Sequence, residues 1–246
     1  MKLSLALIVA IAFSAPEESS SGIAPLLRKF EGTYRSSKTL RATFLQKYFD
    51  NGKLVRSEAG VAYFGKPGKM RWEYESPEAN LYIVDGKWSW FYVPADHTVT
   101  RVRAKQSADT RTPFALLAGE MKVSRICKNV AAEKSVRPSD PDNVVLKCSL
   151  LTTGAADAST GSYVLFELTE STGELRRVVV ADPGGVQVEF QFANWEYNPR
   201  VADATFRFSP PPGVAIVDGD PGTAPEGQRD RPAATLGPLG RQGAPQ

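Results

Sequence analysis

Residues 69–94, KMRWEYESPEANLYIVDGKWSWFYVP, decide the fold of this protein. In the first part of this stretch, Trp72 and Tyr74 alternate with the charged Arg71 and Glu73. Such a period of two is typical of a β-strand with one buried face. The Asp-Gly pair that follows is a strong hairpin signal, because glycine accepts the positive φ angle that tight turns require. The stretch therefore predicts antiparallel strands joined by tight turns.

The same pattern extends in both directions along the chain. Residues 40–47 alternate before an Asn-Gly pair, which is a second hairpin signal. Further strand-like runs cover 163–168, 175–180 and 186–192. Together the runs predict about ten strands and about two or three short helices. A sheet of this size must curl or close. We therefore expect a mainly β (α+β) fold, in which a large curved antiparallel sheet forms an open half-barrel.

Two segments with helical patterns interrupt the strands. Ile23, Leu26, Leu27 and Phe30 recur at helical spacing near the N-terminus. Later, TPFALLAG at 112–119 combines a threonine cap, a proline in the first turn and a closing glycine around an apolar centre. Neither apolar stripe has an obvious place to pack except against the sheet, so we expect these helices to cover the half-barrel as a lid.

Both ends of the chain differ from this central part. Residues 1–14 contain a lysine, an uncharged apolar run and a small-x-small site for cleavage after Ser14, as in an export signal. Residues 219–246 are rich in glycine, proline and alanine and contain no aromatic residue, which predicts a disordered tail. We therefore expect a signal peptide at 1–14, one β domain at 15–218 and a tail at 219–246.

The chain has two cysteines, Cys127 and Cys148, each in a strand-like run. The runs are MKVSRICK at 121–128 and NVVLKCSL at 143–150, and a polar loop with two prolines lies between them. Export places the pair in an oxidising compartment, where a lone pair of cysteines usually forms a bridge. A disulfide between neighbouring antiparallel strands is the economical interpretation, and two buried free thiols are the alternative.

Composition and motifs give little support to catalysis or nucleic-acid binding. The net charge is +3 with both signs interspersed, whereas a nucleic-acid site needs clustered lysine and arginine. His97 is the single histidine and lies in a turn-like PADHT stretch, so a histidine-dependent hydrolase would have to use it. No nucleotide-binding loop, nucleophile elbow or metal-ligand spacing occurs. We therefore expect no enzyme, no cofactor, no metal site and no nucleic-acid partner.

Large apolar side chains are a better guide to function. They are expected to line one face of the sheet, and the few helices leave space above it. An apolar cavity of this kind stays empty or takes lipid. The residues expected to line the cavity and its lid are Leu40, Phe44, Tyr63, Trp72, Trp88, Trp90, Phe114, Leu116, Leu117, Phe190 and Phe192.

Several motifs occur in an order that resembles the LolA family, the periplasmic carriers of outer-membrane lipoproteins. They are FLQKYFDNGK, G-x-x-x-F-x-K-P-G-K-M-R-W-E-Y-x-x-P, IVDGKWSWFYVP, TPFALLAG and FRFSPPPGV, within residues 23–217. The resemblance implies an open antiparallel barrel, capped by helices, that holds lipoprotein acyl chains in its interior. It also implies loading by the inner-membrane ABC complex LolCDE and delivery to the outer-membrane acceptor LolB. We expect a monomer located in the periplasm.

The resemblance further implies a latch for the lid. The family commonly has an arginine that helps to hold the lid closed where this chain has Lys66, and Arg71 matches the arginine of the family's R-W-E motif. Lysine keeps the charge but loses the bidentate geometry of arginine. The alternatives are a sensor or acceptor of the same shape that binds lipid or lipoprotein, and a secreted hydrolase that uses His97. An acceptor is normally lipidated, and no cysteine lies near the predicted cleavage site.

Overall fold

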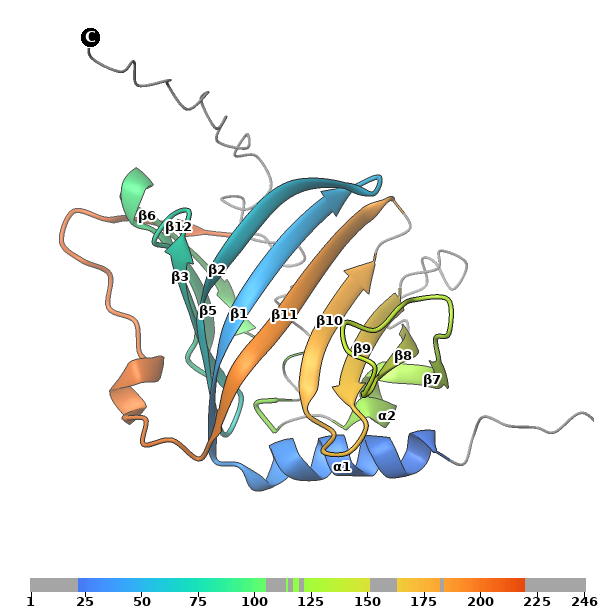
Figure 1. The fold of residues 1–246 in the computed structure, drawn as a ribbon. Coiled ribbons are helices and arrows are strands. Elements are labelled where there is room, and N and C mark those ends of the chain that lie inside the picture. The colour runs from blue at the N-terminus through green and yellow to red at the C-terminus, as the bar shows by residue number, and fades with distance from the viewer. Residues whose placement is uncertain are drawn as a thin grey trace, which may run out of the picture.

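The computed structural model describes residues 22–104, 114, 117–119, 122–150, 163–181 and 184–219. The predicted signal peptide and almost all of the predicted tail lie outside these residues. The three-region division therefore stays a prediction. Figure 1 shows that the described part of the chain is dominated by one strongly curved sheet, with a helix across one end of its strands.

Twelve strands of the described chain form this sheet, in the order β12-β6-β5-β4-β3-β2-β1-β11-β10-β9-β8-β7. All neighbours pair antiparallel except β12 and β6, which are parallel. The edge strands β7 and β12 do not pair with each other, so the sheet is open, as predicted (Figure 1). The strands are β1 (Thr39–Asp50), β2 (Lys53–Gly65), β3 (Lys69–Ser76), β4 (Leu81–Val84), β5 (Trp88–Val93), β6 (Thr98–Arg103), β7 (Cys127–Ala132), β8 (Asn143–Leu150), β9 (Tyr163–Thr169), β10 (Leu175–Ala181), β11 (Val186–Tyr197) and β12 (Ala215–Asp218).

The hairpin turns that the sequence predicted are present. Asn51 and Gly52 join β1 to β2 with φ angles of 47° and 78°, in the left-handed region that Asn-Gly pairs tolerate. Asp85 closes the β4–β5 turn, where its Oδ1 accepts the backbone N–H groups of Lys87 and Trp88 at 2.8 and 2.7 Å. These two turns set the register of four strands, β1 with β2 and β4 with β5.

One strand-like run of the sequence begins as a helix. The run at 121–128 was expected to be extended, but α2 (Val123–Ile126) occupies its middle and β7 starts only at Cys127. The backbone N–H of Val123 donates to the Glu31 carboxylate at 2.9 Å, and that of Arg125 donates to the Lys122 carbonyl at 2.8 Å. These local and side-chain partners satisfy the backbone where no neighbouring strand does.

Helix α1 (Ile23–Ser36) closes one end of the sheet, below β9, β10 and β11 in Figure 1. Its buried side chains are Phe30, Tyr34 and Leu26, which confirms the predicted apolar stripe. The Leu175 N–H donates to the Tyr34 hydroxyl at 2.8 Å, which ties the helix to the start of β10. Gly173 has a φ of +73°, and a Cβ there would lie 2.7 Å from the Phe30 nitrogen, so the β9–β10 turn packs directly on the helix backbone.

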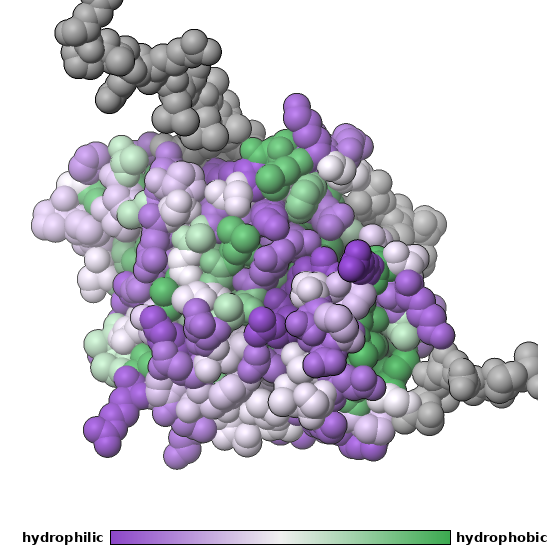
Figure 2. Space-filling model, in the orientation of Figure 1, coloured by the Kyte–Doolittle hydropathy of each residue, from purple (hydrophilic) through white to green (hydrophobic). Residues whose placement is uncertain are grey.

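The sheet has two different faces. The concave face carries Phe44 and Trp72 and packs against α1, in a core that also includes Phe30 and Phe190. The convex face, which is turned to the viewer in Figures 1 and 2, is covered by hydrophilic residues with scattered apolar groups between them (Figure 2). The main apolar core of the described residues is therefore on the concave side.

The loop between β7 and β8 folds over the convex face (Figure 1). A buried carboxylate is bound by this loop. Glu167 on β9 accepts hydrogen bonds from the Ser139 N–H at 2.7 Å and from Asn143 at 2.8 Å. Arg177 Nε lies 2.7 Å from its other oxygen. Burial raises the pKa of Glu167, but the hydrogen bonds from Ser139 and Asn143 and the Arg177 guanidinium outweigh it, so this pKa lies below its ordinary value.

We expect Glu167→Gln to lower the free energy of unfolding by about 2 kcal/mol at neutral pH, because hydrogen bonds to a charged group are lost. A carboxylate whose pKa is lowered by folding contributes stability above its unfolded pKa and loses it as the pH falls through the folded pKa. Wild type should therefore lose stability between neutral pH and about pH 3, and the variant should lose less over this range.

Urea unfolding at a series of pH values measures both effects. The control is Glu196→Gln, which removes the partly exposed ion pair with Arg41 on the convex face and should change stability little. An equal pH dependence in wild type and Glu167→Gln would contradict the role of Glu167.

Candidate functional site

A cluster of aromatic rings fills the centre of the concave face. Trp72 on β3 is completely buried, and the ring centroids of Phe44, Phe114 and Phe190 lie 4.9, 5.1 and 5.5 Å from its own. The indole N–H of Trp72 has no hydrogen-bond partner among the described residues. The centre of the concave face is therefore apolar on all sides. We call this buried cluster the interior.

Seven of the predicted cavity and lid residues meet in the interior. The cross-strand register brings them together, because Phe44 pairs with Phe192 on one side and with Gly60 on the other, and all of these positions point to the concave face. The seven are Leu40, Phe44, Trp72, Phe114, Leu117, Phe190 and Phe192. Leu116 lies outside the described residues.

Three predicted cavity residues point the other way. Tyr63 pairs with Arg71 across β2 and β3 and lies under the Arg41 guanidinium, on the convex face. Trp88 and Trp90 belong to a separate apolar cluster that contains neither Trp72 nor Phe44. The reason is the β4–β5 register, which pairs Tyr82 with Phe91 and so turns Phe91 toward the interior. Because side chains alternate along a strand, Trp90 then points to the opposite face.

The separate cluster on the convex side has its own partners. Trp90 is nearly buried beside Ile83 and Val99, and its indole N–H donates to Asp85 at 2.9 Å. Arg103 lies over the Trp88 ring at 4.1 Å. Both tryptophans thus have a structural role here, and they are not lining residues.

Sequence reasoning missed several interior residues. Four of the aromatic ones lie on strands whose two faces are both apolar, so alternation does not show which face is inside. Counting across the β4–β5 turn would have found two of them, because Trp72 pairs with Tyr82 and Tyr82 with Phe91. These four aromatic residues are Phe64, Tyr82, Phe91 and Phe166.

We call the segment between β6 and α2, residues 105–121, the lid segment, and its described residues insert side chains into the interior. The structure describes only part of it, so the predicted cap at Thr112 and Pro113 lies outside the described residues. Phe114, Leu117 and Ala118 are buried in the same cluster as Trp72. The N–H groups of Leu117 and Ala118 donate to the Phe114 carbonyl at 2.9 and 3.3 Å, as in a helical turn. In this structure these three residues of the lid segment therefore occupy part of the interior.

Several contacts hold the lid segment in place. The Gly68 N–H donates to the Ala118 carbonyl at 3.4 Å. The Lys66 side chain packs on Gly119, because a Cβ added at Gly119 would lie 2.3 Å from Lys66 Cε. The Lys66 ammonium group donates to the Arg35 carbonyl at the end of α1. Burial and the nearby Arg35 guanidinium lower the pKa of Lys66. Lys66 thus lies between α1 and the lid segment, where the predicted latch would be.

Arg71, the second predicted latch residue, is not placed for that role. Its side chain lies on the convex face and pairs with Glu73 at 2.6 Å. It also donates to the carbonyl of Thr205 in the short helix η4 (Asp203–Phe206) at 3.1 Å. The alternation of β3 places Arg71 opposite to Trp72, and so it faces away from the interior. Arg71 therefore ties the C-terminal chain to β3.

We expect Lys66→Met to weaken the closed lid by about 1 kcal/mol, because the hydrogen bond to the Arg35 carbonyl is lost while the aliphatic stem is kept. Hydrogen exchange at the Gly68 amide, which donates to Ala118, should become about fivefold faster. The matched control is Lys69→Met, whose ammonium group pairs with Asp203 at 3.5 Å, outside the lid. Unchanged exchange at Gly68 in the Lys66 variant would show that Lys66 does not hold the lid.

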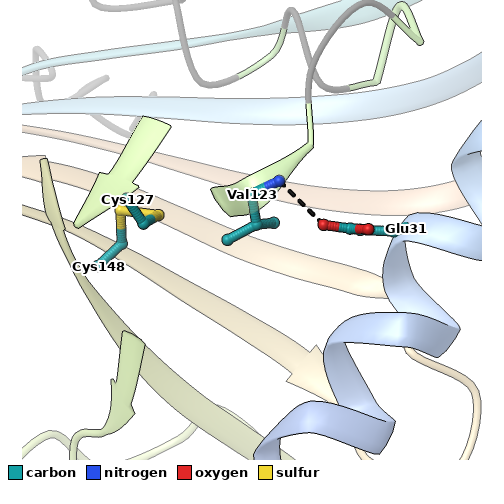
Figure 3. The surroundings of a disulfide bond; sticks show 4 residues. All are labelled: Glu31, Val123, Cys127 and Cys148. Atoms are coloured by element: carbon teal, nitrogen blue, oxygen red, sulfur yellow. Dashed lines mark hydrogen bonds between the residues drawn. A yellow bond between two sulfur atoms is a disulfide. The ribbon is translucent and has the colours of Figure 1, made fainter. Parts of the chain in front are cut away.

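The disulfide lies where the lid segment joins the sheet. Cys127 and Cys148 are bonded, with a Cα–Cα distance of 5.3 Å, and they link β7 to β8 (Figure 3). This confirms the predicted bridge and excludes the alternative of two free thiols. Figure 3 shows α2 between the bridge and α1, with the Val123 N–H directed at Glu31. The chain that follows the lid segment is therefore fixed at two points, Val123 and Cys127.

Other features of the described residues give less support to a site. His97 follows the short helix η1 (Pro94–Asp96), is exposed, and its N–H donates to the Pro94 carbonyl at 3.1 Å. The described residues contain no group of three or more His, Cys, Asp or Glu side chains that could hold a metal ion. None of the described helices has both the length and the apolar character needed to cross a membrane.

A cleft of about 290 Å³ opens between Ser139, Arg177 and Leu45. It is separate from the interior, because Leu45 and Arg177 lie on the convex face. Arg177 is already paired there with Glu167 and Glu189, at 2.7 and 3.6 Å. We therefore take the interior, and not this cleft, as the candidate site.

The open sheet and its filled interior agree with a known family. The profile described as "Outer membrane lipoprotein carrier protein LolA" matches residues 35–209. The chain belongs to the LolA family. An outer-membrane lipoprotein carrier protein of Chromobacterium violaceum is 34% identical over 220 residues, which cover 86% of this chain and 94% of the relative. That of Nitrosomonas europaea is 32% identical, over 73% of this chain and 82% of the relative.

Solved structures give a weaker comparison. A LolA superfamily protein from Nitrosomonas europaea superimposes with a TM-score of 0.42 and 9% identity, over 77% of this chain and 99% of that one. This similarity is too low to carry an argument. The LolA family is a family of carriers, and the assignment of this chain to it rests on the profile and on the relatives in sequence.

Proposed function

We propose that this protein is a periplasmic chaperone that binds the acyl chains of lipoproteins in its interior and carries them from the inner to the outer membrane. The observation that carries the proposal is the filled concave face. Phe114 and Leu117 of the lid segment are buried against Trp72 and Phe190, so an apolar occupant could replace them without exposing the interior to water.

The magnitudes favour exchange of the lid for cargo. Burial of Phe114 and Leu117 contributes about 3 to 6 kcal/mol in total, at about 1.5 to 3 for each side chain. Burial of one acyl chain of about fifteen methylenes contributes about 12 kcal/mol. Cargo therefore displaces the lid side chains from the interior. Competition from the lid lowers the net affinity for cargo, so that cargo can leave for an acceptor that binds it better.

The family supports a defined place in a transport route. Under this proposal the export signal at 1–14 directs the chain to the periplasm, the ABC complex LolCDE loads it, and LolB or an equivalent acceptor takes the cargo. The protein acts as a carrier without catalysis or cofactor. The latch role of Lys66 is part of this proposal, and its support is the contact with α1 beside Gly119.

A lipidated acceptor of the same fold is the second candidate function, and the disulfide favours the carrier over it. Lipidation requires a cysteine at the mature N-terminus, whereas the two cysteines of this chain are bonded to each other within the sheet. A sensor that binds lipoproteins without moving them differs from a carrier in one property, because only a carrier passes its cargo on.

Mass spectrometry of the protein purified from its native host tests the proposal. Bound triacylated proteins are expected. The purified complex should then transfer its lipoprotein to acceptor-containing membranes, and a sensor would retain it. Bound free lipid in place of lipoproteins would favour lipid transport, and an empty interior after purification from growing cells would argue against both.

A further inference from the structure

The concave face is polar at one end of its strands. Near the β1–β2 hairpin, Gln46 pairs with Glu58 and Tyr48 pairs with Arg56. Their positions alternate in step with Phe44, so all four side chains lie on the concave face. Tyr74 on β3 lies beside them and donates from its hydroxyl to Gln46 Oε1 at 2.8 Å. We call these five residues the polar end.

The polar end contains a buried ion pair with spare hydrogen-bonding capacity. Arg56 Nη2 lies 2.5 Å from Glu58 Oε1, and the two side chains are only 13% and 1% exposed. Arg56 Nη1 is also buried, and it has no hydrogen-bond partner among the described residues. Such a donor is unfavourable inside an apolar face unless something accepts from it. Arg56 Nη1 therefore requires a hydrogen-bond acceptor.

The opposite end of the concave face is apolar. There Leu40 pairs with Phe64 and Phe64 with Met70, and Phe30 of α1 lies in the same core. From Leu40 to Gln46 the strand β1 spans roughly 20 Å, at about 3.3 Å per residue. One leaflet of a bilayer, the thickness that an acyl chain covers, is about 15 Å. An acyl chain therefore fits lengthwise between α1 and the polar end.

The surface beside the polar end exposes large apolar side chains. Leu54 and Val55 on β2 and Val186 on β11 are the large apolar side chains exposed near the hairpin, at 49%, 42% and 47%. The Asn51 N–H donates to the Gly185 carbonyl at 3.0 Å, which joins the two turns that carry them. An apolar edge thus borders the polar end on the outside.

We propose that the interior binds acylated cargo in one orientation, with the chain ends against α1 and the ester and peptide carbonyls of the lipidated terminus at the polar end. This inference rests on the proposed function. A triacylated terminus has an apolar part and a cluster of carbonyl oxygens that only accept hydrogen bonds. The concave face has the matching division, and Arg56 Nη1 supplies the donor.

Photolabelling of the purified full-length protein tests the orientation. Two synthetic triacylated lipopeptides are used, one with a diazirine at the end of an acyl chain and one with a diazirine on the peptide next to the lipidated cysteine. The chain-end probe is expected to label residues near Leu40 and Phe30, and the head probe residues near Tyr48 and Arg56. The reverse pattern, or both probes at both ends, would overturn the inference.

The same experiment separates this inference from the function on which it rests. Labelling that excess unlabelled lipopeptide competes away shows that the interior binds acylated cargo, whatever the orientation. Labelling that is not competed away would contradict the proposed function and the orientation together. Competed labelling with reversed positions would contradict the orientation alone.

A double variant tests the role of the polar end in cargo binding. Replacing both Arg56 and Glu58 by leucine avoids an unpaired buried charge, and such replacements commonly leave a fold intact. We expect the double variant to bind the triacylated lipopeptide about tenfold more weakly, since a charge-assisted hydrogen bond is lost. Its affinity for a long-chain alkane, which has no carbonyl, should be unchanged or higher.

The matched control replaces the convex-face pair Arg41 and Glu196 by leucine, and both affinities should stay as in wild type. Equal loss of lipopeptide and alkane binding in the Arg56/Glu58 variant would show a general packing defect and overturn the assigned role. Unchanged lipopeptide binding would overturn it as well.

Discussion

Phe114→Ala is expected to tighten the binding of acylated cargo by at least about tenfold. The Phe114 ring is completely buried, with its centroid 4.8 Å from that of Phe190 and 5.1 Å from that of Trp72. Truncating such a side chain costs about 3 to 5 kcal/mol. Under the proposed function, this cost falls on the closed form alone, because cargo replaces the ring. A competitor of cargo is thereby weakened, and each 1.4 kcal/mol changes an equilibrium constant about tenfold.

Equilibrium binding of a triacylated lipopeptide measures this effect, and release to acceptor membranes should become slower in the same variant. The matched control is Trp90→Ala, which removes a nearly buried ring on β5 from the separate convex cluster and not from the interior. The control should lower the free energy of unfolding without tightening binding. Weaker binding by Phe114→Ala would show that this ring contacts cargo and does not compete with it.

Replacing both Cys127 and Cys148 by alanine is expected to lower the free energy of unfolding by about 3 kcal/mol. The bridge joins residues 21 apart, and a crosslink of this span restricts the unfolded chain by about that amount. For a domain of this size the melting temperature should fall by about 6 to 12 °C. Alanine is chosen because both cysteines are buried, Cys148 completely.

Reversible denaturation with and without reductant tests the role of the bridge. Reduced wild type should resemble the double variant, and the variant itself should not respond to reductant. Because the bridge fixes β7 next to α2, hydrogen exchange at Val123, whose N–H donates to Glu31, should also become faster in the variant. A stability loss below about 1 kcal/mol would show that the sheet holds β7 without the bridge.

Much of the fold could be predicted because local sequence patterns determine its turns, strands and first helix. The Asn51-Gly52 turn and the alternation on either side of it predicted the β1–β2 hairpin, and the structure confirms its position. Helix α1 followed from its apolar spacing in the same way. The disulfide followed from the number of cysteines and the export signal, and the structure confirms it.

The failures have a common cause. The run at 121–128 was expected to be a strand, but the N–H groups of Val123 and Arg125 donate to Glu31 and to the Lys122 carbonyl. Arg71 matched a family motif, yet the pleat of β3 turns it away from the lid. In both cases the neighbours that decide the outcome lie far away in the sequence.

The sequence by itself determined that this chain forms an open antiparallel sheet with a bridged pair of strands, because turns, alternation and cysteine count are properties of short stretches. Only the tertiary structure decided which aromatic rings make the site. On β5 both faces are apolar, and Phe91 points inward while Trp90 points outward because the register pairs Phe91 with Tyr82. The direction in which a sheet curves, and hence its inner face, depends on all of its strands together.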